Sequence, residues 1–137
     1  MSSAAMARPD IEQMVRGFED ATLDPGGFDH EAHILVGWQY LQDYSLLDAI
    51  TRFTGALARL TRKLGVPAKY HETITWFYLI KIAERCAGMP GADWPAFKAA
   101  NPDLFAWGPS LIGEYYSESL LFSETARRAF VFPDRLP

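Results

Sequence analysis

The stretch Phe28-Asp29-His30-Glu31-Ala32-His33 decides how the rest of the chain is arranged. Asp29 has a short acceptor side chain directly before a helix-compatible run, which is the pattern of a helix N-cap. Apolar residues then recur every three or four positions, so we predict a helix from His30 to about Asp43 with one face toward the core. His30 and His33 lie one turn apart beside that face. Both imidazoles are therefore expected to point inward or to the edge of the core.

A second stretch, Tyr70-His71-Glu72-Thr73, contains the third and last histidine of the chain. Between the two stretches, the pattern predicts one long helix over residues 46–64. It begins after Ser45, which resembles the first residue of a capping box, and ends at Gly65, a natural residue after a helix. A third long helix is expected to start near Tyr70.

The lengths of these helices bring the two stretches together. At about 1.5 Å per residue, the first helix runs roughly 20 Å away from His30 and the second returns over roughly 28 Å. Short connections make neighbouring helices antiparallel, so the third helix starts beside the beginning of the first. We therefore predict that His30, His33, His71 and Glu72 converge on one end of a helical bundle.

The run from Ile74 to Ile80 has the propensity of a buried strand. Its apolar character continues through Ile82 and Cys86, with charged residues between them. This longer pattern suits a largely buried helix better than a strand. We therefore include the run in the third long helix.

Shorter helices are expected at both ends of the chain. An amphipathic helix is predicted from Pro9 to about Asp20, and residues 1–8 are expected to be disordered. Three short C-terminal helices are predicted over residues 94–100, 111–116 and 123–130. The predicted fold is all-α: a single-domain bundle, residues 1–137, of about four main helices with short C-terminal helices packed over it.

Composition and charge narrow the class of protein. A chain of 137 residues with 14% aromatic and 22% charged residues fits one well-packed domain. The net charge of −4 argues against nucleic-acid binding through overall positive charge. Single Cys86 excludes an internal disulfide and fits a reducing compartment. Residues 1–10 lack the pattern of a secretory signal and the apolar runs are too short to span a bilayer, so we expect a cytoplasmic protein with no membrane or nucleic-acid partner.

Four short motifs carry a resemblance to other proteins. They are Phe28-x-His30-x-x-His33; Tyr70-His71-Glu72-Thr73-x-Thr75-Trp76; Tyr115-Tyr116-Ser117; and Ala126-Arg127-Arg128-x-Phe130-Val131-x-Pro133-Asp134. This pattern, which spans about residues 28 to 135, resembles a family of small, uncharacterised bacterial proteins. The resemblance implies a bacterial origin and no particular function.

A first interpretation of the histidines is a metal centre. Neutral imidazoles of His30, His33 and His71 would bind a divalent transition metal such as Zn, Fe, Mn, Ni or Cu, with Glu72 or Glu31 as a fourth ligand. The positive end of a helix dipole disfavours imidazolium, so these positions favour the neutral form that a ligand must have. Such a centre suits a hydrolase or oxygenase-type enzyme acting on a small molecule, with Glu72 as general base.

A second interpretation needs no metal. The same histidines, with Glu72 and Tyr70, would then do acid–base work or hydrogen-bond an organic ligand in an aromatic pocket lined by Trp38, Trp76 and Tyr78. Two helix N-termini that point together would also attract a carboxylate or phosphate.

A third interpretation is structural. The histidines would satisfy buried backbone groups or each other, and the protein would be an interaction module. The sequence leaves all three interpretations open.

Overall fold

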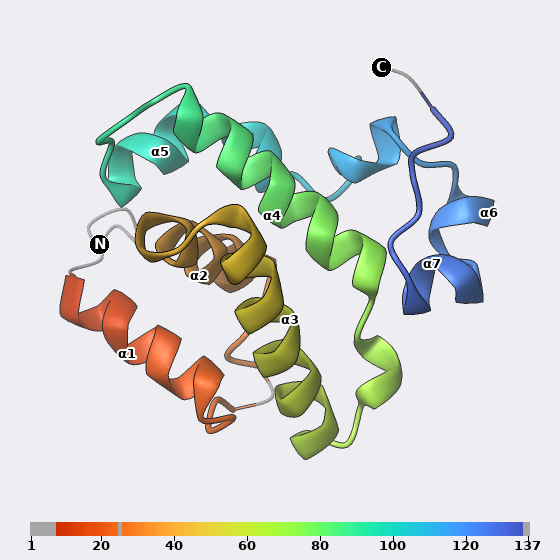
Figure 1. Cartoon of the computed structure of the whole chain (residues 1–137), viewed down its shortest axis with the longest axis horizontal. Coiled ribbons are helices and arrows are strands. Elements are labelled where there is room, and N and C mark those ends of the chain that lie inside the picture. The colour runs from red at the N-terminus through yellow and green to blue at the C-terminus, as the bar shows by residue number, and fades with distance from the viewer. Residues whose placement is uncertain (1–7, 25, 136–137) are drawn as a thin grey trace.

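Four long helices form the body of the protein in a computed structural model that describes residues 8–24 and 26–135 (Figure 1). They are α1 (Arg8–Glu19), α2 (His30–Asp43), α3 (Leu46–Lys63) and α4 (Glu72–Ala87). The predicted bounds of the first histidine-bearing helix and of the helix after Ser45 are confirmed to within a residue. The helix predicted near Tyr70 begins two residues later, because a 3-10 turn, η2 (Pro67–Lys69), comes first.

Side-chain caps set where the long helices begin. The Asp29 carboxylate accepts a hydrogen bond from the Ala32 amide at 2.9 Å, and the Ser45 hydroxyl accepts one from the Asp48 amide at 3.2 Å. Each cap satisfies one of the N–H groups that have no partner inside the first turn. At the other end of α3, Gly65 has φ of +76°, the left-handed conformation that ends a helix at low cost in glycine. Short-range chemistry thus explains the bounds of α2 and α3.

The helices α2 and α4 pack closely at Gly37. A Cβ atom on this glycine would lie 3.1 Å from Leu79 Cδ2 and 3.1 Å from Ile82 Cδ1. The run from Ile74 to Ile80 is part of α4, so its assignment to a helix is confirmed. Two α4 side chains therefore lie directly against Gly37, and a larger residue at this position would require both of them to shift.

Two clusters of buried side chains hold the body together. Between α1, α2 and α3, Phe18 packs on Tyr40 and Phe53, with ring centroids 6.2 and 4.8 Å away. Between α2, α4 and the following α5 (Trp94–Ala100), Trp38 packs on Trp94 with centroids 5.6 Å apart. Because α2 contributes to both clusters, it is almost entirely enclosed from Ile34 to Tyr40.

The chain after α5 consists of short elements: η3 (Pro102–Leu104), η4 (Ile112–Glu114), α6 (Glu118–Leu121) and α7 (Glu124–Arg128). The helix predicted over 111–116 is only a 3-10 turn, α6 was not predicted, and the helix predicted over 123–130 ends at Arg128. The early end of α7 has a tertiary cause. The Thr73 hydroxyl on α4 donates to the Ala129 carbonyl at 2.8 Å and accepts from the Val131 amide at 3.2 Å, which holds these residues extended.

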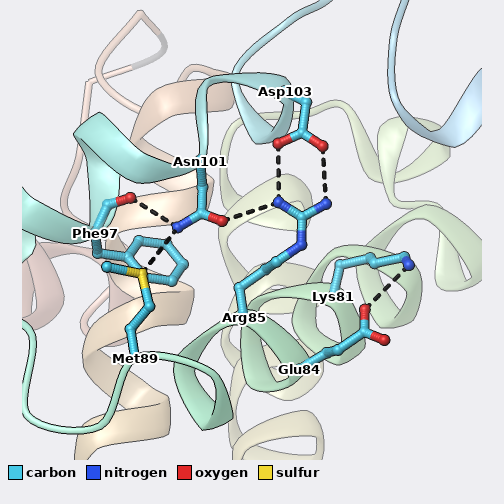
Figure 2. A network of polar contacts seen from close by, with 7 residues as sticks. All are labelled: Lys81, Glu84, Arg85, Met89, Phe97, Asn101 and Asp103. Atoms are coloured by element: carbon cyan, nitrogen blue, oxygen red, sulfur yellow. Dashed lines mark hydrogen bonds and ion pairs between the residues drawn. The ribbon is translucent and has the colours of Figure 1, made fainter.

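A polar network ties α4 to the segment after α5 (Figure 2). The Arg85 guanidinium donates two hydrogen bonds to the Asp103 carboxylate, at 2.9 and 2.8 Å, and one to the Asn101 side-chain carbonyl at 2.9 Å. Asn101 is buried and donates to the Phe97 carbonyl at 2.8 Å. Because this pair makes two parallel hydrogen bonds, it fixes the relative orientation of the two side chains in addition to joining opposite charges. The network therefore holds η3 in place against α4.

The predicted all-α class is confirmed: within residues 8–24 and 26–135 the chain forms seven α-helices and no named strand. The disorder predicted for residues 1–8 concerns residues 1–7, which lie outside the described range, and Arg8, which is the first residue of α1. In the described part of the chain, no helix is both long and apolar enough to cross a membrane.

Candidate functional site

A pocket of about 310 Å³ lies between the N-terminal turns of α2, the middle of α3 and one face of α4. We call it the histidine pocket. Most of its wall is aromatic or aliphatic: Phe28, Phe53, Leu57, Ile74, Tyr78, Leu79, Ile82 and Trp107. Its other lining residues are polar: Asp29, His30, His33, Lys69, His71 and Thr75. An apolar wall with a few polar groups is the usual make-up of a small-molecule site.

All three histidines line this pocket, so their predicted convergence is confirmed. Glu72 does not line it. The Glu72 carboxylate instead accepts a hydrogen bond from the Tyr70 hydroxyl, and burial, followed by this bond, raises the pKa of Tyr70. The pairing of Glu72 with its neighbour two residues back turns the carboxylate away from the histidines.

Of the three aromatic residues expected in the wall, Tyr78 lines the pocket and the two tryptophans do not. Trp38 faces the core that α2 shares with α5. Trp76 stacks on Phe130 of the C-terminal segment, with centroids 5.2 Å apart. The lining positions on α4 fall near a period of 3.6, and Trp76 lies on a different side of that helix.

His30 is the first residue of α2 and bonds far along the chain. Its Nε2–H donates to the Leu104 carbonyl at 2.8 Å, since a carbonyl can only accept. The ring packs between Tyr78 and Trp107, with centroids 4.9 and 4.7 Å away. Among the described residues, no group bonds to His30 Nδ1.

His33 uses the other ring nitrogen, Nδ1, for its hydrogen bond to the backbone. Its Nδ1–H donates to the Asp29 carbonyl at 3.0 Å, and its ring lies 4.2 Å from the ring of Phe28. Burial lowers the pKa of His33 to about 4, with a smaller contribution in the same direction from nearby His30. The imidazole is therefore neutral at pH 7, and Nε2 carries a lone pair that no described residue uses.

His71 has both ring nitrogens in hydrogen bonds. It is the N-cap of α4: Nδ1 accepts from the Ile74 amide at 3.1 Å, while Nε2–H donates to the Leu121 carbonyl at 2.7 Å. Burial is the main cause that lowers the pKa of His71 and keeps it neutral. The structure thus gives His71 a structural role at the start of α4, as the third interpretation expected of a histidine.

Tyr78 adds a polar group to the wall. Its side chain is buried, and its hydroxyl has no hydrogen-bond partner. Burial raises the pKa of Tyr78 to about 12, against a smaller opposing effect of the Ile112 backbone. In the described part of the chain, two polar side-chain atoms are buried without a hydrogen-bond partner: Tyr78 Oη and Trp76 Nε1. The unbonded nitrogens of His30 and His33 are not among them, and both residues line the pocket.

No group of three or more His, Cys, Asp or Glu side chains is arranged to hold a metal ion in residues 8–24 and 26–135. His71 would have to release the Ile74 amide before it could act as a ligand. The metal role of His30, His33 and His71, and the ligand or base role of Glu72, stay predictions.

Two polar lining residues were not singled out from the sequence. Thr75 donates its hydroxyl to the His71 carbonyl at 2.7 Å, so its donor is used locally. Lys69 is exposed at the end of η2, and no described carboxylate lies within ion-pair distance of its ammonium. The predicted antiparallel helices required the chain to reverse here, but this did not predict that Lys69 would line the pocket.

Comparisons of the chain with protein-family models, with curated proteins and with solved structures find no significant match. The function therefore has to be argued from the geometry of the histidine pocket.

Proposed function

We propose that the protein binds a small organic molecule with an apolar body and a hydroxyl or amine group in the histidine pocket. One observation carries the proposal. In a largely apolar wall, His30 and His33 each use one ring nitrogen on a backbone carbonyl and keep the other unbonded. The pocket thus offers two acceptor nitrogens, and a hydroxyl or amine is the group that complements them.

The neutrality of His33 supports a donor-bearing ligand. Because burial holds its pKa near 4, His33 Nε2 is an acceptor across the physiological range. Satisfying such an acceptor contributes about 0.5–1.5 kcal/mol, and burying apolar surface adds about 25 cal/mol per Å². A pocket of about 310 Å³ is at the small end for ligand sites, so the ligand is about the size of one aromatic ring with a short substituent.

The proposal is for binding rather than for proton transfer. A general base works best with a pKa near the working pH, and the pKa of His33 is far below it. Glu72, the residue expected to act as base, is paired with Tyr70 outside the pocket lining.

A matched pair of probes tests the proposal. We expect 4-ethylphenol to bind the full-length protein several-fold more tightly than ethylbenzene, measured by calorimetry, because only the phenol donates a hydrogen bond. His33→Phe keeps a ring in place but removes the acceptor, so it should abolish most of this difference. Equal affinities of the two probes for the wild-type protein would rule the proposal out.

His71→Asn is the matched control. Asparagine is a good N-cap, so it keeps an acceptor for the start of α4 while it removes the bond to Leu121. We expect a lower melting temperature and an unchanged preference for 4-ethylphenol. A lost preference would mean that His71, and not His33, receives the ligand.

A metal centre is a second candidate. It is favoured by the hydrogen bonds that His30 and His33 make to backbone carbonyls. Metal-bound histidines usually donate their other N–H to a carbonyl or carboxylate, and His30 and His33 both do so. Metal analysis after equilibration with Zn²⁺ tests this candidate. His30→Ala and His33→Ala should each lose a stoichiometric ion if one binds, while Glu72→Gln and His71→Asn should keep it. A wild-type protein that takes up no Zn²⁺ and gains no stability from it would exclude a zinc centre.

A further inference from the structure

A second cavity adjoins the histidine pocket and extends it. This adjoining cavity has a volume of about 340 Å³ and lies along the C-terminal half of α3 and the turn that follows. It shares Phe28, His33, Leu57 and Lys69 with the histidine pocket. Because four residues line both spaces, the two cavities are direct neighbours.

The two spaces differ in charge. The Asp29 carboxylate lines the histidine pocket but not the adjoining cavity, whereas Lys69 lines both. No described carboxylate pairs with Lys69, so its ammonium has its donors available. An anionic group of a ligand is therefore repelled by Asp29 in the histidine pocket and attracted by Lys69, which lines both spaces, so it is favoured in the adjoining cavity.

The hydrogen-bond donors of the adjoining cavity point to the same residue. The Thr61 hydroxyl donates to the Ala58 carbonyl at 3.0 Å, and the N–H of His33 is used on Asp29. The Lys69 ammonium is left to donate to an anion. Leu60, Leu64 and Val66 provide apolar surface in the adjoining cavity.

We infer that the combined site takes an elongated organic carboxylate that carries a hydroxyl or amine at its far end. The hydroxyl or amine lies in the histidine pocket, and the carboxylate lies beside Lys69 in the adjoining cavity. This inference rests on the proposed function and names its ligand class. It assigns Lys69 as the residue that selects an acid over its neutral analogue.

The test compares 3-(4-hydroxyphenyl)propionate with its uncharged amide, using calorimetry on the full-length protein. We expect the acid to bind about fivefold more tightly at low salt, which corresponds to about 1 kcal/mol, the upper range for a solvent-exposed ion pair. The advantage should shrink to less than about twofold at 0.5 M NaCl, because salt screens exposed charges. Lys69→Met should remove it at low salt.

The control is Lys63→Met, which removes an exposed lysine of the last turn of α3 that lines neither space. It changes the net charge by the same amount and should leave the preference for the acid intact. If Lys63→Met reduced the preference as much as Lys69→Met, the effect would be one of net charge and the inference would be wrong.

The two proposals fail in different ways. If 4-ethylphenol binds in a His33-dependent manner while the acid shows no advantage over its amide, the assignment of Lys69 is overturned and the proposed function stands. If neither phenol nor acid binds, both are overturned. An advantage of the acid that survives Lys69→Met would place the anion elsewhere and also overturn the inference.

Discussion

The long-helix body and the segment after α5 both bury apolar side chains, but they differ in their polar contacts. In the body, α2 is enclosed by α1, α3 and α4 through apolar side chains such as Ile34, which has no exposed surface. The segment 101–135 also buries apolar side chains such as Leu104 and Ile112, and in addition it attaches to α4 through side-chain bonds to backbone groups, such as those of His71 to Leu121 and Thr73 to Ala129. Some large aromatic residues of this segment stay exposed: Phe132 is 82% exposed, whereas Tyr116 is buried.

The difference shows how the pocket depends on both regions. Most of the apolar wall comes from the body, but Trp107 comes from the second region, and the Nε2–H of His30 is held by the Leu104 carbonyl of that region. The Arg85–Asp103 pair fixes that carbonyl in turn (Figure 2). A change in the body should therefore unfold the whole chain, whereas a change in the polar contacts should loosen one segment and only disturb the site.

The largest expected effect is that of Ile34→Ala. Truncation of a fully buried isoleucine costs about 2–5 kcal/mol, because transfer energy is lost and a cavity remains. Chemical denaturation should show this loss, and hydrogen exchange should show amides of α2, α3 and α4 losing protection together. Loss of protection in α2 alone would contradict the view of the body as one cooperative unit.

A smaller and local effect is expected for Thr73→Val. The change keeps the shape but removes a hydroxyl that bonds both the Ala129 carbonyl and the Val131 amide, at a cost of about 1–3 kcal/mol. Hydrogen exchange should rise in residues 115–135 and stay unchanged in α2 and α3.

The control for this change is Thr51→Val on α3, where an exposed hydroxyl bonds to the Leu47 carbonyl of the same helix. It should change stability by less than about 0.5 kcal/mol. If Thr73→Val raised hydrogen exchange equally in all parts of the protein, the segment 101–135 would unfold together with the body. The two regions would then not be distinct.

The smallest effect concerns pH. The pKa of His33 is about 4 in the folded protein and near 6.5 when unfolded, so below pH 6.5 the unfolded chain binds more protons. Stability should fall as pH decreases from 6.5 toward 4, by on the order of 1 kcal/mol between pH 6.5 and 5.5. His71, whose pKa is also lowered, acts in the same direction.

The contribution of His33 is isolated by comparison with His33→Phe, which should lose stability less steeply over this interval. Histidine resonances measured by NMR give the pKa directly. A pKa of His33 near 6.5 in the folded protein would contradict this prediction. It would show that the ring is solvated and that the pocket is open to water.

The sequence alone determined the long helices and the meeting of the histidines. Asp29, Ser45 and Gly65 mark helix ends through bonds within a few residues, and the apolar period repeats over enough turns of α2, α3 and α4 to exclude a strand. The lengths of these helices then place His30, His33 and His71 at one end. Each of these features follows from interactions between neighbours along the chain or from helix geometry.

Only the tertiary structure decided what the side chains at that end do. His71 uses both nitrogens because Leu121, 50 residues away, accepts from one of them. Glu72 turns to Tyr70, and Lys69 and Thr75 line the pocket. The last helix, α7, likewise ends where Thr73 bonds to the backbone of Ala129 and Val131. The bonds of His71 and Thr73 depend on partners far away in the chain, so the local pattern of apolar residues does not predict them.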